Sequence, residues 1–194
     1  MTPGSNLLPT SHPHEVADRE SGNPLPTAPS RHHEGGSRTL HFGVLTTSDT
    51  HTEDDDESGH LVRDLLVQGG HEVRHYRLVA NSVADIRETL SGWLSDTSVE
   101  AIITIGGTGV SSRDVTVEAL ESWPGIKRLE GFGSLYRMLS FSEVGALAAM
   151  SRAGLYVLQN RPIFAVPGSE RACRLALGRL ILPMVQHLVE ELER

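Results

Sequence analysis

Apolar side chains follow two alternating patterns along the chain from Thr39 onward. Short apolar or alternating runs are typical of strands, and apolar residues spaced three or four apart are typical of helices. The runs that predict strands are residues 40–45, 71–78, 101–105, 154–158 and 162–166. The spacings that predict helices lie in residues 58–70, 82–94, 115–120, 131–139 and 142–152, and in a C-terminal helix after Ser169 that Pro183 should kink.

This alternation predicts an α/β fold, because strands that alternate with helices usually form a parallel sheet covered by those helices. The last two strands, joined around Asn160-Arg161, carry the signal of a hairpin instead, so we expect a mostly parallel sheet. In such sheets ligands bind beyond the carboxyl ends of the strands. The segments that follow the strands are therefore the first candidates for a binding site.

Residues 1–38 differ in composition from the rest of the chain. They hold six of the ten prolines and four of the ten histidines, with few apolar side chains. Such a segment cannot bury enough apolar surface to offset its chain entropy, so we expect a disordered extension before a folded domain of residues 39–194. Its histidines are candidates for metal binding, although solvated side chains are the favoured interpretation: His12, His14, His32 and His33.

A glycine-rich segment, Gly106-Gly107-Thr108-Gly109, directly follows the apolar strand of residues 101–105. Glycines let backbone N–H groups approach a ligand closely, and such amides ahead of a helix suit an anion, most often a phosphate. Arg113 adds a forked cation, and Asp114 adds a carboxylate able to hold hydrated Mg²⁺. The segment predicts a site for a phosphorylated ligand; the alternative is a glycine turn in which Asp114 caps the next helix.

Polar residues after other strands and around predicted helix starts are further candidates. Asp49 follows the first strand, and we expect it to have a structural or ligand-facing role. The acidic loop of residues 53–57 is a candidate metal site, but a solvated loop is the favoured interpretation. Ser140 or Ser142 is expected to cap a helix, and the Ser140 hydroxyl is also a candidate phosphate ligand.

A second anion-binding segment is predicted where Gly168-Ser169 follows the last strand and opens a helix. Arg137 and Arg152 are candidates for phosphate partners on the same face. The alternative for each of them is an ordinary surface arginine.

Charge and cysteine content narrow the function classes. The 194 residues carry a formal net charge of -8, so we expect no nonspecific nucleic-acid partner. No apolar run approaches the length that spans a bilayer, so we expect no membrane partner. The single cysteine, Cys173, excludes an internal disulfide, is expected to be packed in a helix core, and fits a reducing cytoplasm.

Taken in order, these motifs resemble those of the MoaB/MogA family of molybdenum cofactor biosynthesis proteins, with MoaB the nearer of the two. The resemblance extends over residues 39–194. The segments that carry it are Ser48-Asp49-Thr50 with Asp55 and Ser58-Gly59, Gly106-Gly107-Thr108-Gly109, Arg113-Asp114-Val115-Thr116, Gly131-Phe132-Gly133, Arg137-Met138-Leu139-Ser140, Met150 to Gly154, and Pro162 to Ser169.

The resemblance implies a three-layer α/β fold, assembly as a homotrimer or homohexamer, and binding of molybdopterin. Active members transfer AMP from Mg-ATP to the terminal phosphate of molybdopterin. Carried onto this chain, the glycine segment would hold phosphate and Asp114 matches a catalytic aspartate that works through Mg²⁺. Ser140 matches a serine that contacts the pterin ligand, and Pro167-Gly168-Ser169 would complete the pocket.

One position departs from the family pattern. Where active members carry a second important carboxylate after the second strand, this chain has Asn81. An amide oxygen is able to ligate Mg²⁺ but brings no charge. The resemblance implies a molybdopterin adenylyltransferase that uses Mg-ATP. If the missing carboxylate helps to hold the metal, the alternative is a slow enzyme or a molybdopterin-binding protein without turnover. A shift of register would bring in Asp85 as the nearest acid, and the structural alternative is that Asn81 caps the helix that begins at Ser82.

Overall fold

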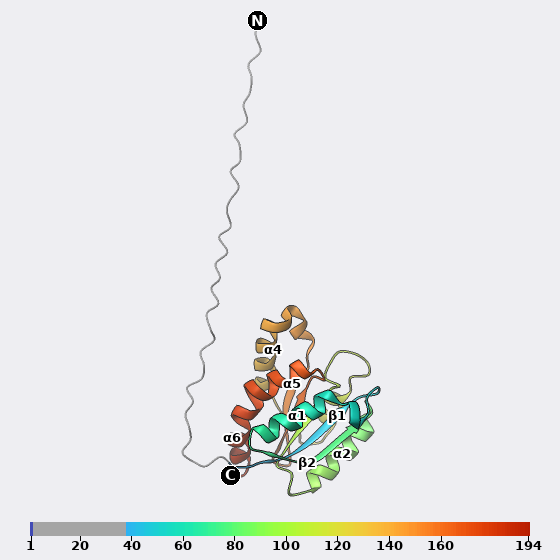
Figure 1. Ribbon diagram of the computed structural model, residues 1–194, viewed down its shortest axis with the longest axis vertical. Coiled ribbons are helices and arrows are strands. Elements are labelled where there is room, and N and C mark those ends of the chain that lie inside the picture. Colours follow the sequence, from blue (N-terminus) through green and yellow to red (C-terminus); the bar gives the residue numbers. More distant parts are fainter. Residues whose placement is uncertain (2–37) are drawn as a thin grey trace. The chain divides into compact units, whose positions relative to one another are not determined.

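A six-stranded sheet forms the centre of residues 38–194, which the computed structural model describes together with Met1 (Figure 1). The strand order is β2-β1-β3-β6-β5-β4. The strands are β1 (His41–Thr47), β2 (Glu72–Val79), β3 (Ala101–Ile105), β4 (Lys127–Leu129), β5 (Gly154–Leu158) and β6 (Arg161–Val166). β2, β1, β3 and β6 pair in parallel, whereas β5 runs antiparallel to both β4 and β6, so the predicted, mostly parallel sheet is confirmed.

Two apolar clusters, one on each face of the sheet, complete the three layers that were expected. The helices are α1 (Glu57–Gln68), α2 (Val83–Ser95), α3 (Thr116–Glu121), α4 (Glu130–Val144), α5 (Glu170–Ala176) and α6 (Leu182–Leu192). On one face, α1, α4, α5 and α6 pack with Phe42, Ile103 and Phe164. On the other, α2 and α3 pack with Leu45, Ile102 and Ile163. Alternate residues of β1, β3 and β6 thus serve opposite faces, as the pleat of a strand requires.

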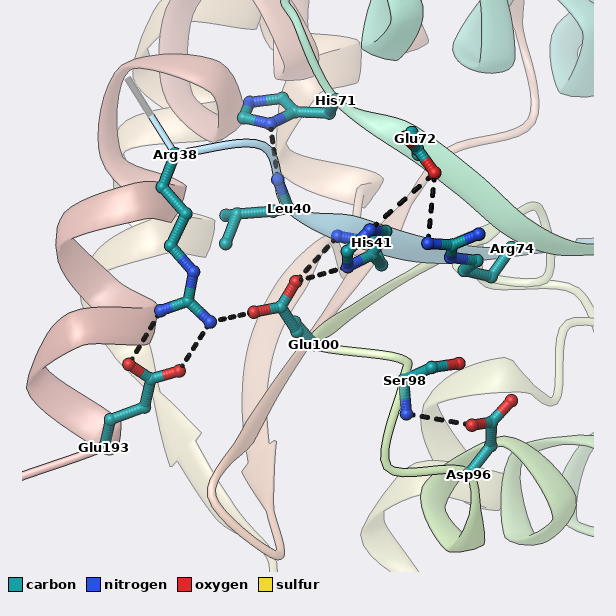
Figure 2. A network of polar contacts seen from close by, with 10 residues as sticks. All are labelled: Arg38, Leu40, His41, His71, Glu72, Arg74, Asp96, Ser98, Glu100 and Glu193. Atoms are coloured by element: carbon teal, nitrogen blue, oxygen red, sulfur yellow. Dashed lines mark hydrogen bonds and ion pairs between the residues drawn. The ribbon is translucent and has the colours of Figure 1, made fainter. Parts of the chain in front are cut away.

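An ion-pair network surrounds Arg38, shortly before the start of β1 (Figure 2). The Arg38 guanidinium donates to both carboxylate oxygens of Glu193 at 2.8 and 2.9 Å, and it also contacts Glu100. Glu100 in turn accepts a 2.9 Å hydrogen bond from the backbone N–H of His41. The network ties the start of β1 to the C-terminal end of α6. The predicted N-terminal extension and its histidines lie outside the described residues.

The region predicted as two helices over 131–139 and 142–152 is one helix, α4, followed by the 3₁₀ helix η2 (Gly145–Met150). The two-helix prediction is wrong because nothing in between breaks the backbone. Ser142 donates its hydroxyl back to the Leu139 carbonyl at 2.7 Å, within the helix. The break comes at Gly145, whose φ of 60° is the left-handed conformation that glycine favours. Neither Ser140 nor Ser142 is the predicted N-cap.

The hairpin between β5 and β6 is confirmed, with its turn one residue earlier than predicted. Leu158 pairs with Arg161, and the two turn residues, Gln159 and Asn160, have φ values of 52° and 58°. Two left-handed residues in succession match the twist of a two-residue hairpin. Strand β4 was not predicted, because three residues with two exposed charges carry no strand pattern.

Helical structure runs from Glu170 to Leu192, over 23 residues, and the mean hydropathy of an 18-residue stretch within it is 1.2, so by length and composition it just reaches the minimum for a membrane span. Its apolar side is nevertheless packed on the sheet, with Cys173, Ile181 and Val185 fully buried. A π-helical turn, η3 (Leu177–Ile181), precedes Pro183 in the first turn of α6, which is the predicted interruption. Burial raises the pKa of Cys173 to about 12, as befits a packed thiol.

Two glycine-to-alanine changes, one in α1 and one in α2, test the close contact at the first turn of α1. A Cβ at Gly59 would lie 2.0 Å from the Asp56 carboxylate, so Gly59→Ala should cost about 2 kcal/mol or more of stability. Gly92 in α2 has no atom within 4 Å of the added carbon, so Gly92→Ala should stabilise by roughly 0.5–1 kcal/mol. Thermal unfolding of both variants measures the difference, and an equal gain for both would contradict the described contact.

Candidate functional site

A polar cavity of about 480 Å³ opens beyond the carboxyl ends of β1 and β3. The N-terminal end of α1 and the segment after β6 complete its wall. Its lining residues are Thr46, Thr47, Ser48, Asp49, Thr50, His51, Asp55, Asp56, Glu57, Ser58, Asn81, Ile105, Gly107, Arg113, Asp114, Gly168, Ser169 and Glu170. This is the edge of the sheet at which parallel α/β folds bind ligands.

Most of the residues predicted for the site meet in this cavity. Seven of them line it: Asp49, Asn81, Gly107, Arg113, Asp114, Gly168 and Ser169. Ser140 and Pro167 line a neighbouring cavity of about 160 Å³, and Ser169 borders both cavities. Gly106, Thr108 and Gly109 belong to the same loop but are not among the residues that line either cavity. The residues predicted to form one site therefore lie along two neighbouring cavities.

The glycine loop makes turns that a side chain would block. Gly106 and Gly107 have φ values of 90° and 63°. A Cβ on Gly107 would lie 2.2 Å from the Thr116 hydroxyl, and one on Gly106 would lie 2.7 Å from the Thr47 carbonyl. The Gly106 amide donates to the Val166 carbonyl at 3.0 Å, whereas the Gly107 amide donates to no described residue. An N–H group at the cavity wall is thus left for an acceptor from outside the protein.

Asp114 reaches the cavity from the turn that follows the glycines. Its Oδ2 accepts a 2.8 Å hydrogen bond from the Ser111 amide, and a Cβ on Gly109 would lie 2.7 Å from the same oxygen. Val115, not Asp114, occupies the N-cap position of α3, and that end has no side-chain cap. The alternative interpretation of Asp114 as a helix cap is therefore wrong, and its carboxylate keeps further lone pairs toward the cavity.

Asp49 connects two other candidates. Its Oδ1 accepts a 2.9 Å hydrogen bond from the backbone N–H of Asn81, and its Oδ2 lies 3.8 Å from the Arg113 guanidinium. Ser82 rather than Asn81 caps α2, because its hydroxyl accepts from the Asp85 amide at 3.3 Å. Asp85 is exposed within α2 and is not part of the cavity lining. The side-chain oxygen of Asn81 is buried and has no hydrogen-bond partner among the described residues.

Arg152 holds the glycine loop and is not a free phosphate partner, contrary to one prediction. Its backbone amide donates to the Thr108 carbonyl at 2.9 Å, and its guanidinium donates to the Gly109 carbonyl at 2.7 Å and the Asp114 carbonyl at 2.8 Å. The same guanidinium pairs with Glu118. Arg137 is also absent from the cavity lining, and it donates to the Ser151 carbonyl at 3.4 Å.

Comparison with known proteins identifies the family. Residues 43–187 match a family model described as "Probable molybdopterin binding domain". The chain belongs to this family. Proteins named molybdenum cofactor biosynthesis protein B are similar to it. That of Staphylococcus epidermidis is 43% identical over 162 residues, 81% of this chain and 92% of the relative. That of Bacillus subtilis is 38% identical over 152 residues, which are 78% of this chain and 89% of the relative.

Solved structures share the fold. A crystal structure of molybdenum cofactor biosynthesis protein B, 38% identical, has a TM-score of 0.77 and covers 81% of this chain and 98% of its own. The tungsten cofactor synthesizing protein MoaB of Pyrococcus furiosus, 29% identical, has a TM-score of 0.73 and covers 81% and 99%. The predicted relationship to MoaB and MogA is confirmed, and it places this family member in molybdenum cofactor biosynthesis.

The acidic loop contains one residue whose role was missed. Asp56 is 4% exposed, and its Oδ1 caps α1 by accepting from the Gly59 amide at 2.9 Å. Its Oδ2 accepts from the Tyr76 hydroxyl at 2.7 Å, and burial together with this bond raises the pKa of Tyr76. The rest of the loop is exposed, and no described cluster of three histidines, cysteines or acids is arranged to hold a metal ion. The spacing of Asp56 before Ser58-Gly59 was the available signal for this cap.

The second cavity contains a tyrosine beside Ser140. Tyr136 is 2% exposed, and burial raises its pKa to about 12, so it is a neutral phenol at physiological pH. Ser169, at the border of the two cavities, is the N-cap of α5 and accepts from the Ala172 amide at 3.3 Å. On the other side, the Ser58 hydroxyl donates to the Gly168 carbonyl at 2.7 Å and ties α1 to this segment.

The ion pair that holds the glycine loop gives a pH-dependent prediction. This pair joins Glu118 and Arg152, and the hydrogen bond from Arg152 lowers the pKa of Glu118 from its ordinary value of 4.5. The pair's contribution to stability is therefore complete above that value and is lost as the pH falls through the lowered folded-state pKa. The Tm difference between wild type and Glu118→Gln should shrink between about pH 6 and pH 3. Thermal unfolding across this range tests the pair, and a difference that grows on acidification would count against it.

Proposed function

We propose that this protein binds molybdopterin and adenylylates its terminal phosphate with Mg-ATP. The observation that carries the proposal is the meeting of an uncommitted glycine amide, Arg113, Asp114 and Asn81 in one cavity. These residues come from segments far apart in the sequence, after β2 and after β3. Phosphoryl-group chemistry requires one site that combines a hydrogen-bond donor to the phosphate, a cation and a carboxylate.

The reaction balances without a covalent enzyme intermediate. An oxygen of the terminal phosphate of molybdopterin attacks the α-phosphorus of ATP and forms a new P–O bond. The bond from the α-phosphorus to the oxygen that bridges to the β-phosphate breaks, and pyrophosphate leaves. No nucleophilic side chain is needed, so the protein contributes position and charge.

The residues of the cavity suit these tasks. The Gly107 amide would donate to a phosphate oxygen, and Arg113, with its side chain 76% exposed, is able to turn from Asp49 toward the same group. Asp114 would hold Mg²⁺, which in phosphate sites commonly binds one or two carboxylates together with substrate phosphates. The partnerless oxygen of Asn81 fits a cation or a donor, since a carbonyl oxygen only accepts. When bound, Mg²⁺ neutralises the charge of the phosphates.

The second cavity supports a division of the two substrates. It is lined by Tyr136, Ser140 and Pro167, and it shares the lining residue Ser169 with the polar cavity. Adjacent compartments would bring two phosphorylated molecules within reach of each other. We assign the pterin part of molybdopterin to the Ser140 side and the phosphates to the glycine-loop side.

A carrier of molybdopterin that does not turn over is the second candidate. It is favoured by Asn81, which brings a neutral amide where the resemblance leads one to expect a carboxylate. The two candidates share the binding site and differ only in the chemical step.

A pyrophosphate-release assay with purified protein, molybdopterin and Mg-ATP separates them. Asp114→Asn should lower the rate about a hundredfold or more, because the charge that holds the cation is lost. Asp85→Asn, an exposed aspartate of α2, is the matched control and should leave the rate unchanged. Asn81→Asp should raise the rate if the amide limits turnover. Tight molybdopterin binding by the wild type without any pyrophosphate release would reject the enzyme and favour the carrier.

We further propose that the protein assembles as a homotrimer or homohexamer through the apolar surface of α4 and η2. Large apolar side chains are exposed there: Leu135, Met138, Phe141, Leu147 and Met150. Phe141 and Leu147 each have an exposed fraction of 63%, which is unusual for side chains of this size. Leu147 also lines the second cavity, so a neighbouring copy on this surface would border the pterin compartment.

Assembly is tested by light scattering during gel filtration. The double variant Met138→Glu with Phe141→Glu should shift the mass toward that of a 21.1 kDa monomer, because two charges cannot be buried unpaired in an apolar contact. Val67→Glu changes an exposed apolar residue of α1 and should leave the mass unchanged. A monomeric wild-type protein would overturn this assembly.

A further inference from the structure

Thr46, near the end of β1, has a buried hydroxyl without a partner. The residue is 5% exposed, and its Oγ1 forms no hydrogen bond with any described residue. Thr46 lines the polar cavity. A buried hydroxyl that gives up water without gaining a partner destabilises the folded protein, so its presence calls for an explanation.

Other buried threonines of the same region show what a structural hydroxyl looks like here. Thr47 donates to the Ile105 carbonyl at 3.2 Å, and Thr116 donates to the Gly106 carbonyl at 2.9 Å. Thr104, fully buried on β3, donates to the Phe164 carbonyl at 3.4 Å. Thr46 differs from all of these, because its proton has no acceptor within the domain.

The surroundings of Thr46 favour a negatively charged acceptor. A Cβ on Gly59 would lie 2.9 Å from Thr46 Oγ1, so the hydroxyl lies against the first turn of α1. The N-terminal end of a 12-residue helix carries partial positive charge. The Asp56 carboxylate lies against the same position of Gly59, and it is already bonded to the Gly59 amide and the Tyr76 hydroxyl. Thr46 also pairs in register with Ile105, the residue that precedes the glycine loop on the neighbouring strand.

We propose that Thr46 is a ligand-binding residue whose hydroxyl donates to a phosphate oxygen of the bound molecule. The phosphate chain would then be held from two neighbouring strands, by Thr46 of β1 and by the Gly107 amide after β3. This assignment rests on the function proposed above and names the polyphosphate part of the nucleotide as the group recognised. It also gives the buried, unpaired hydroxyl of Thr46 an acceptor.

Calorimetric titration of the full chain with Mg-ATP, paired with thermal unfolding of the ligand-free protein, tests the assignment. Thr46→Val should weaken Mg-ATP binding about tenfold or more, because a hydrogen bond to a charged oxygen is lost. Its ligand-free Tm should be unchanged or higher, since no protein bond is broken. Thr46→Ser restores the hydroxyl and should bind like the wild type.

Thr104→Val is the matched control, because it removes a buried hydroxyl that has a protein partner. It should leave the affinity for Mg-ATP unchanged and should not raise the Tm. If Thr46→Val binds Mg-ATP as well as the wild type does, or if its ligand-free Tm falls, the assignment of Thr46 is wrong while the proposed function stands. If the wild type itself fails to bind Mg-ATP, the proposed function fails first.

Discussion

The close approach of backbone to side chain at the end of β3 is the constraint on which the site depends. Gly107 lies so near Thr116 that an added carbon would come within 2.2 Å of its hydroxyl. Only a residue without a Cβ fits at this point of the loop, where the chain also takes a positive φ at the wall of the cavity. The Arg152 guanidinium then fixes the far side of the loop through the Gly109 and Asp114 carbonyls. Position, rather than any reactive side chain, is what the fold provides.

Most buried polar side chains have a hydrogen-bond partner within the protein, and a few have none. Structural groups such as Asp56 and Thr116 have protein partners at normal distances. Among the described residues, the buried side-chain atoms without partners belong to Thr46 and Asn81, and both residues line the same cavity. Unpaired buried groups cost stability, so their concentration at one place supports the proposal that this cavity binds a ligand.

Much of the fold and of the cavity lining could be predicted from the sequence, and the predictions that were wrong have physical reasons. Strand and helix periodicity gave the layers, and the motif order brought Asp49, Asn81 and Asp114 to one edge, because parallel strands share their carboxyl ends. The continuity of α4 was missed because serine has no backbone signature that separates a cap from a helix interior. The role of Arg152 was missed because its partners are backbone carbonyls, which no residue pattern encodes.

Charge in the cavity constrains what is able to enter it. Six carboxylates line it, from Asp49, Asp55, Asp56, Glu57, Asp114 and Glu170, against the single arginine Arg113. A bare polyphosphate would meet net repulsion there, so a phosphate ligand gains most when it arrives with its own divalent cation. In such a negatively charged cavity, the neutral side chain of Asn81 has two opposite effects. A neutral amide would lower the repulsion of bound phosphates but would give up attraction for a cation. Under the proposed function, the residue at position 81 would therefore set the balance between binding the nucleotide and turning it over.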